Sequence, residues 1–219
     1  LRALDIGPGD EVITPPNSFV ASTAAIVQVG ARPVFVDVQA DQNIDPNLIP
    51  MAITPRTRAI MPVHLSGRVA EMESIETIAE QHGLYIVEDA AQAIGSRYRE
   101  KPSGSLGTIG CFSTHPLKNL NACGDGGFLT TNDKNIAERV RLMRNHGMVD
   151  RETITRFGQV SRMDALQAAV LCFRLERLFD VIEKRRRNAN RYLAGLNSEK
   201  IFVPIETENE FHSYHTFVI

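Results

Sequence analysis

Cysteine is scarce in this sequence and follows no recognisable spacing. The chain of 219 residues contains three cysteines, Cys111, Cys123 and Cys172. Their number is odd and no C-x-x-C pair occurs, which argues against a disulfide framework and against a structural zinc site. Because free cysteine is commonly buried, we expect all three to be packing residues.

Basic charge and long apolar runs are also lacking. The formal net charge is -2, which leaves no surplus of Lys and Arg to neutralise a phosphate backbone, so a nucleic-acid partner is not expected. No apolar run approaches the roughly 18 residues of a membrane-spanning helix, and the N-terminus lacks the basic and then apolar layout of a signal peptide. We therefore predict a cytoplasmic protein that binds neither nucleic acid nor membrane.

The sequence has no internal repeat, no low-complexity tract and no G-x-G-x-x-G turn after its first predicted strand. The missing turn argues against a generic α/β nucleotide-binding domain. Apolar residues, in contrast, are plentiful: they make up 43% of the chain. A chain of this length and composition can bury a sizeable core in one large domain, alone or with a smaller appendage.

Short β-branched runs alternate with helical patterns over most of the chain. The predicted strands are EVIT (11–14), PVFVDV (33–38), RAIMPVH (58–64), LYIVED (84–89), TIGCFS (108–113) and GFLTT (127–131). The predicted helices are Ser18–Val29, Met72–His82 and Lys134–Asn145, which end at Gly30, Gly83 and Gly147. This alternation predicts an α/β domain with a mostly parallel sheet whose strands are buried on both faces.

The pattern changes after Arg162, where a long helical stretch without a strand runs to about Leu196 and predicts a connector helix or a pair of helices. KIFVP (200–204) and YHTFVI (214–219) then have the composition of strands. We place a large domain at residues 1–185 and the start of a smaller C-terminal domain at residues 186–219. Because the chain begins without Met and ends inside a predicted strand, we expect it to be a fragment.

Two ionisable residues follow predicted strands. Asp89 ends LYIVED, and Lys118 follows TIGCFS in the stretch CFSTHPLKNLNACGDGGF. Ligands of parallel sheets bind beyond the carboxyl ends of the strands, so both side chains are candidates to face one crevice. A partly desolvated lysine can form a Schiff base with a carbonyl, and an aspartate can keep a pyridine nitrogen protonated. From the residues alone, Asp89 could instead cap a short helix and Lys118 could be a surface lysine.

Histidines, a glycine-rich stretch and a basic run give weaker signals. His64, His115 and His146 could touch a substrate or shape a pocket, but a structural role is the preferred interpretation of each. GDGG (124–127) lacks the Lys and Ser/Thr of a P-loop, so we expect a tight turn into the next strand. The basic run at 184–187 predicts a solvated helix face.

Seven stretches match, in order, the motifs of one family. They are GPGDEVITPPNSFVAS, GARPVFVDV, ITPRTRAIMPVHLSG, IAEQHGLYIVEDAAQAIGS, GCFSTHPLKNLNACGDGGFLTTND, RNHG and SRMDALQAAVL. On these stretches the chain resembles the DegT/StrS sugar aminotransferases, which use pyridoxal 5′-phosphate. The resemblance implies the type I fold of aspartate aminotransferase, an α/β large domain with a mostly parallel mixed sheet followed by a smaller C-terminal domain.

Carried over residue by residue, the resemblance implies five cofactor-binding positions. Lys118 matches the catalytic lysine that binds the cofactor covalently, and Asp89 matches the residue that bonds the pyridine nitrogen. Gln92 matches a position against the cofactor ring, and Ser113 matches a phosphate ligand. Phe19 matches the aromatic residue that stacks on the ring, although from the sequence alone it could be a core residue of the first predicted helix.

The chain departs from the family pattern in two places. Relatives commonly carry asparagine in a GxNSR segment, where it reaches the cofactor phosphate of the partner subunit. Here the segment is GQVSR, and Val160 cannot donate that hydrogen bond. Relatives also begin earlier, and their phosphate-binding Gly-Thr or Gly-Ser turn lies before Leu1.

The resemblance implies an aminotransferase that moves an amino group from glutamate or glutamine to a keto sugar, which we expect to be nucleotide-linked. It also implies a homodimer. Two alternatives remain open. One is a sugar dehydratase of the same fold, although those relatives have histidine where Lys118 stands. The other is a regulatory or non-catalytic protein that binds the cofactor.

Overall fold

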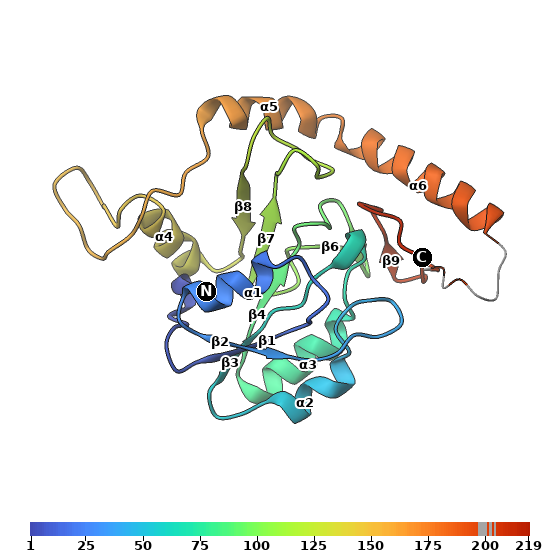
Figure 1. Cartoon of the computed structure of the whole chain (residues 1–219). Coiled ribbons are helices and arrows are strands. Elements are labelled where there is room, and N and C mark those ends of the chain that lie inside the picture. The colour runs from blue at the N-terminus through green and yellow to red at the C-terminus, as the bar shows by residue number, and fades with distance from the viewer. Residues whose placement is uncertain (197–200, 202, 204) are drawn as a thin grey trace.

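The computed structural model describes residues 1–196, 201, 203 and 205–219, and its core is a six-stranded sheet with helices on both faces (Figure 1). The strands are β1 (Glu11–Thr14), β2 (Arg32–Phe35), β3 (Thr57–Ile60), β4 (Tyr85–Asp89), β5 (Arg97–Tyr98), β6 (Lys101–Pro102), β7 (Ile109–Ser113), β8 (Gly127–Thr130) and β9 (Glu210–Phe211). The α-helices are α1 (Ala21–Gln28), α2 (Ile49–Ala52), α3 (Met72–His82), α4 (Lys134–Met143), α5 (Ala165–Leu175) and α6 (Leu178–Gly195). Short 3-10 turns lie at Arg2–Leu4, Pro46–Leu48 and Leu65–Gly67.

The sheet has the strand order β2-β1-β3-β4-β7-β8. All neighbouring pairs are parallel except β7 and β8, which are antiparallel. The predicted mostly parallel mixed sheet is therefore confirmed. Because β4 and β7 are parallel neighbours, their carboxyl ends, Asp89 and Ser113, lie at the same edge of the sheet.

Alternate residues of the central strands enter two separate hydrophobic cores. On β1, Val12 packs in a cluster with Ile26 of α1 and Ile136 of α4. Its neighbour Ile13 packs on the other face in a cluster with Ile75 of α3. Burial of each such side chain stabilises the fold by about 1.5–3 kcal/mol. The helices on the two faces thus hold the sheet from both sides and leave its carboxyl edge open to loops.

The prediction that every strand is buried on both faces is wrong for the two edge strands. β2 is partly exposed, and all four residues of β8 are exposed. Of the strands between them, β1 is buried at every position and β4 in its middle, whereas the last three residues of β7 are only partly buried. A strand at the edge of a sheet has a neighbour on one side only, and its β-branched composition does not reveal that position.

Of the three predicted helices, the second agrees best with the structure. α3 spans Met72–His82 as predicted, and Gly83 ends it with a left-handed φ of 63°. The first helix begins only at Ala21, because the residues before it form a turn. The third predicted helix ends at Met143 rather than Asn145, since Asn145 pairs with Val160 instead.

The long helical stretch is a pair of helices, as one of the two predicted alternatives stated. α5 and α6 lie beyond the carboxyl end of the sheet in Figure 1. α6 runs without a break through residues 185 and 186, so no change of element marks the domain boundary placed there. The boundary stays a prediction. Within the described residues, none of the helices combines the length and apolar character needed to cross a bilayer.

The predicted strand YHTFVI is wrong, and β9 lies just before it. Arg185 of α6, rather than a strand ladder, holds this segment by donating to Tyr214 O (3.3 Å) and His215 O (2.8 Å), and Arg186 donates to His212 O just before it (2.8 Å). Tyr214 has a φ of 47°, which no strand allows. Residues 200, 202 and 204 of the other predicted strand, KIFVP, lie outside the described residues.

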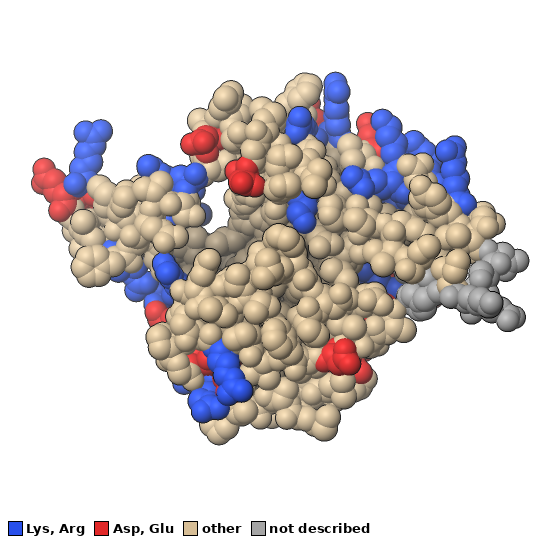
Figure 2. All heavy atoms as spheres, in the orientation of Figure 1, with Lys and Arg blue, Asp and Glu red and all other residues tan. Residues whose placement is uncertain are grey.

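The basic run on α6 is only partly a solvated face. Lys and Arg gather over α6 in Figure 2, and Lys184 and Arg187 are exposed. Arg185 and Arg186 are half-buried because their guanidinium groups bind the C-terminal segment. Four adjacent charges cannot all face water on one helix, since neighbouring residues point in different directions.

The cysteine prediction is only partly correct. All three cysteines are free. Cys111 is half-buried on β7, whereas Cys123 and Cys172 are exposed. The expectation that all three pack in the core is therefore wrong for the last two, which lie on a loop and on an uncovered face of α5.

Candidate functional site

Asp89 ends β4 and is held on both carboxylate oxygens. Ser22 Oγ of α1 donates to Oδ2 at 2.6 Å, and the main-chain N–H of Ala91 donates to Oδ1 at 3.1 Å. The bond from Ala91 belongs to a turn, and no helix begins at Asp89. The interpretation of Asp89 as a helix cap is thus not supported, and the carboxylate points toward α1 rather than along a helix axis.

A cavity of about 260 Å³ lies between α1 and the ends of β4 and β7. Ser22, Asp89 and Ser113 contribute polar groups to its wall, and Cys111 and Phe112 contribute to the rest. Two of the five predicted site residues, Asp89 and Ser113, therefore face one space. Their strands bring them there because Asp89 pairs in register with Cys111, just before the end of β7.

Lys118 lies in a turn that follows β7, closed by a hydrogen bond from its own N–H to His115 O (2.8 Å). Its side chain is half-buried. Burial lowers the pKa of Lys118, and the charge of Asp89 partly opposes this shift. The amine is therefore half-buried and interacts electrostatically with the Asp89 carboxylate, and its role at the site stays a prediction.

Gln92 and Phe19 do not line the cavity but adjoin residues that do: Gln92 follows Ala91, and Phe19 O accepts a hydrogen bond from the main-chain N–H of Ser22 (3.2 Å). Gln92 Oε1 accepts a hydrogen bond from the main-chain N–H of Ser66 at 2.8 Å, which leaves its amide NH₂ as the free end. Phe19 precedes α1 and is 71% exposed. The alternative that Phe19 is a core residue is therefore wrong, and its aromatic face is accessible to a ligand.

No pattern in the sequence indicates that the C-terminal segment lies beside the site. Ser213 Oγ accepts a hydrogen bond from Ser96 Oγ at 2.8 Å, and Asn119, next to the lysine, donates to Ser213 O at 3.4 Å. Burial, with the charges of Lys118 and Arg185, lowers the pKa of the following His215 to about 4. No spacing in the sequence relates this histidine to Lys118; only the folded chain places it within electrostatic reach.

The three weaker histidine candidates fall into two groups. His64 is fully buried and hydrogen-bonded to Glu88 at 3.0 Å, which confirms a structural role. His115 and His146 are exposed. Glu88 was missed by the sequence reasoning, although a charged residue inside the apolar run LYIVED was the available signal.

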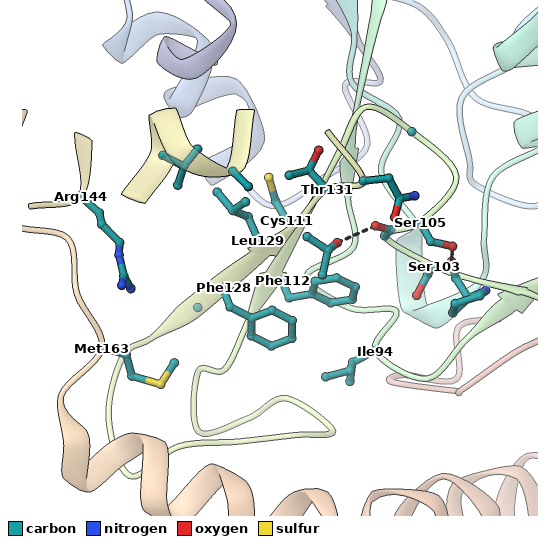
Figure 3. A pocket seen from close by; sticks show the side chains of 18 of the residues that line it. Ile94, Ser103, Ser105, Cys111, Phe112, Phe128, Leu129, Thr131, Arg144 and Met163 are labelled. Carbon is teal, nitrogen blue, oxygen red and sulfur yellow. Dashed lines mark hydrogen bonds between the residues drawn. The ribbon is translucent and has the colours of Figure 1, made fainter. Parts of the chain in front are cut away.

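A larger cavity, of about 1170 Å³, lies along β7 and β8 and contains none of the five predicted site residues (Figure 3). Its wall is mainly apolar and includes Phe112 and Phe128, whose rings stack with centroids 4.8 Å apart. The GDGG stretch beside it bends at Gly124 and Asp125 before β8 begins at Gly127, so the tight turn expected there is present only as a bend. In the part of the chain that the structure describes, no cluster of three or more His, Cys, Asp or Glu could hold a metal ion.

The α/β fold with its mostly parallel mixed sheet is that of the pyridoxal-phosphate-dependent aminotransferases. A solved structure of DesV from S. venezuelae, in complex with a ketimine intermediate, superimposes with a TM-score of 0.96 at 44% identity, and the match covers 99% of this chain and 59% of that one. The chain belongs to the DegT/DnrJ/EryC1/StrS aminotransferase family, whose sequence model matches residues 1–219.

Curated relatives match along the whole chain. A pleiotropic regulatory protein of Geobacillus stearothermophilus is 43% identical, with 100% of this chain and 60% of the relative covered. The dTDP-3-amino-3,4,6-trideoxy-alpha-D-glucose transaminase of Streptomyces venezuelae is 44% identical, with 100% of this chain and 58% of the relative covered. This chain thus spans about 60% of the length of these relatives.

Proposed function

We propose that the full-length protein transfers an amino group from glutamate or glutamine to a nucleotide-linked keto sugar, with pyridoxal 5′-phosphate as cofactor. The observation that carries the proposal is that Asp89 ends β4 and Lys118 follows the end of its parallel neighbour β7, with the pKa of the amine lowered by burial. Family membership over residues 1–219 supports the reaction class. The transaminase from Streptomyces venezuelae supports the choice of a nucleotide-linked sugar.

The residues around the smaller cavity fit this cofactor. The Asp89 carboxylate suits a protonated ring nitrogen, and the Ser113 hydroxyl suits a phosphate oxygen. Phe19 offers an exposed aromatic face for a flat ring, and the free amide of Gln92 offers a donor for a ring oxygen. Lys118 supplies an amine for covalent attachment.

When bound, the cofactor supplies an electron sink for the carbon that loses a proton. Lys118 then serves as the group that takes and returns the proton at Nζ. Burial favours its neutral form, which a base needs, while the charge of Asp89 limits the shift. Asp89 keeps two hydrogen bonds to the protein, so its orientation does not depend on the ligand.

The cellular location and the oligomeric state are part of the same proposal. We propose that the protein is cytoplasmic and that it is a homodimer; the family resemblance implies the homodimer. In such a dimer, Val160 would offer no side-chain donor to the phosphate of the partner subunit. Val160 pairs with Asn145 and is 57% exposed, so we expect an apolar contact in place of the hydrogen bond from asparagine.

A second candidate function has one observation in its favour. The relative from Geobacillus stearothermophilus is named a pleiotropic regulatory protein. Under that function, the protein would bind the cofactor through the same residues and transfer no amino group. A sugar dehydratase is the less favoured third candidate, because Lys118 occupies the position of its histidine.

A panel of nucleotide-linked keto sugars tests the proposal. The full-length protein is incubated with pyridoxal 5′-phosphate and glutamate or glutamine, and the mass of each product is measured. We expect an amino sugar from at least one keto sugar. Lys118→Ala should reduce the rate by a factor of at least about 10²–10⁴, the contribution of a positioned general base.

Lys184→Ala is the matched control, because Lys184 is exposed on α6. It should leave the rate unchanged. Cofactor binding with no amino transfer to any sugar of the panel would favour the regulatory function. Full activity of Lys118→Ala would refute the assignment of the lysine.

A further inference from the structure

A buried carboxylate on β4 lies next to the candidate site. Glu88 is 0% exposed. Its Oε1 accepts hydrogen bonds from the main-chain N–H groups of Leu106 (2.8 Å) and Gly107 (2.5 Å), and its Oε2 accepts one from Gly104 (2.6 Å). His64 Nε2 lies 3.0 Å from Oε2. Burial alone would raise the pKa of Glu88, but these bonds hold it below its usual value, so the carboxylate is charged.

His64 connects this carboxylate to the main chain of Asp89. The N–H of Ala70 donates to His64 Nδ1 (3.2 Å), so the ring proton is on Nε2 and is donated to Glu88. The main-chain N–H of His64 donates to Asp89 O (3.0 Å), and the N–H of Asp89 donates to Pro62 O (2.9 Å). The imidazole is thus fixed at both nitrogens, while its own main chain fixes Asp89.

The loop 103–107 connects the same carboxylate to β7, which ends at Ser113. The loop lies beside β7 in Figure 3. Gly110 of β7 has no room for a Cβ, because main-chain atoms of Gly104 occupy that space. The loop therefore rests directly on the strand. Through three N–H groups of this loop, Glu88 fixes both strands whose ends line the cavity.

The charge of Glu88 also acts on the cavity side of the sheet. Burial raises the pKa of Cys111 to about 11, and the charges of Asp89 and Glu88 add to this rise. Cys111 lines the cavity and pairs in register with Asp89. A ligand in the cavity would therefore meet the field of both carboxylates.

We propose that Glu88 and His64 form a positioning pair that holds Asp89, and with it the ring of a bound cofactor, in a fixed orientation. This inference rests on the proposed function, because Asp89 meets the ring only if the cofactor binds. A pair that acted only on the fold would change stability and leave the orientation of the ring unchanged.

Visible circular dichroism of the bound cofactor separates these possibilities, because the band depends on how the protein holds the ring. The full-length wild type and Glu88→Gln are titrated with pyridoxal 5′-phosphate. Glu88→Gln removes the charge. It also replaces one accepting oxygen with an NH₂ group, which cannot accept a hydrogen bond from a main-chain N–H. We expect an altered band and about tenfold weaker binding of the cofactor. Replacing a residue that supports a metal ligand weakens metal binding by about tenfold or more, and we expect a loss at the lower end of that range.

Glu11→Gln is the matched control. Glu11 is 2% exposed and accepts hydrogen bonds from Thr54 Oγ1 (2.6 Å) and Arg56 (2.8 Å). It begins β1, so it lies at the amino end of the parallel strands, away from the cavity at their carboxyl ends. It should lower the resistance to urea and leave the band and the affinity unchanged. If Glu88→Gln and Glu11→Gln give the same band and affinity, the positioning role is refuted.

His64 provides a second test if Glu88→Gln fails to fold. His64→Gln keeps a donor for Glu88 and an acceptor for Ala70, whereas His64→Leu removes both. We expect the band to change in His64→Leu and to recover toward wild type in His64→Gln; equal bands would refute the inference. A wild type that shows no band with the cofactor would instead refute the proposed function.

Discussion

The close approach at Gly67 gives a quantitative test of how the C-terminal segment is held beside the site. Gly67 has a φ of 96°. A Cβ added there would lie 2.5 Å from Ser213 Oγ, 3.1 Å from His215 N and 3.2 Å from Gln92 O. Two of these atoms belong to the main chain, so relief of the contact requires the loop or the segment to move.

Gly67→Ala therefore carries two costs. A positive φ costs a non-glycine residue about 1–2 kcal/mol, and overpacking of a tight site costs about 1–3 kcal/mol. We expect the free energy of unfolding to fall by their sum, about 2–5 kcal/mol. Gly9 is the matched control, because its φ is 93° and a Cβ there would meet nothing within 4 Å. Gly9→Ala should lose only the conformational cost, about 1–2 kcal/mol.

Urea unfolding of the two variants and the wild type, in the full-length protein, measures the difference. A second readout is the affinity for pyridoxal 5′-phosphate. It should fall in Gly67→Ala, because the contact with Gln92 O displaces a predicted cofactor residue, and it should not change in Gly9→Ala. Equal losses of stability in the two variants would show that the segment yields freely at Gly67 and would refute the reasoning.

Two further predictions concern acid stability and thiol reactivity. Burial, with the charges of Arg68 and Arg186, lowers the pKa of His212 from 6.5 to about 3. Between these values the unfolded chain binds the proton and the folded protein does not, so stability falls as the pH falls through this range. His212→Gln should flatten the fall, and the exposed control His82→Gln should not; urea unfolding at about pH 7 and about pH 4.5 decides. Timed alkylation read by mass should modify Cys123 and Cys172 rapidly and Cys111 only after denaturation, because the latter thiol has its pKa raised to about 11; equal rates would contradict the burial of Cys111.

The central strands and α3 were predictable because their signals are local. An apolar run bounded by turn residues specifies β4, and the spacing of Met72, Ile75 and Ala79 places one apolar stripe on α3. Gly83 then ends the helix through a conformation that glycine adopts readily. The edge position of β8 was not predictable, since it depends on which strands of the sheet lie beside it.

The candidate site shows the same division. The sequence by itself determined that Asp89 and Ser113 end strands and that Lys118 follows in a turn, and the family resemblance named all three as candidates. Only the tertiary structure decided that Asp89 and Ser113 share a cavity, that Glu88 and His64 bond to each other, and that the C-terminal segment lies beside Lys118. The physical reason is range. Periodicity and turn chemistry record what a residue does with its near neighbours, whereas the order of the strands and the approach at Gly67 bring together atoms far apart in the chain.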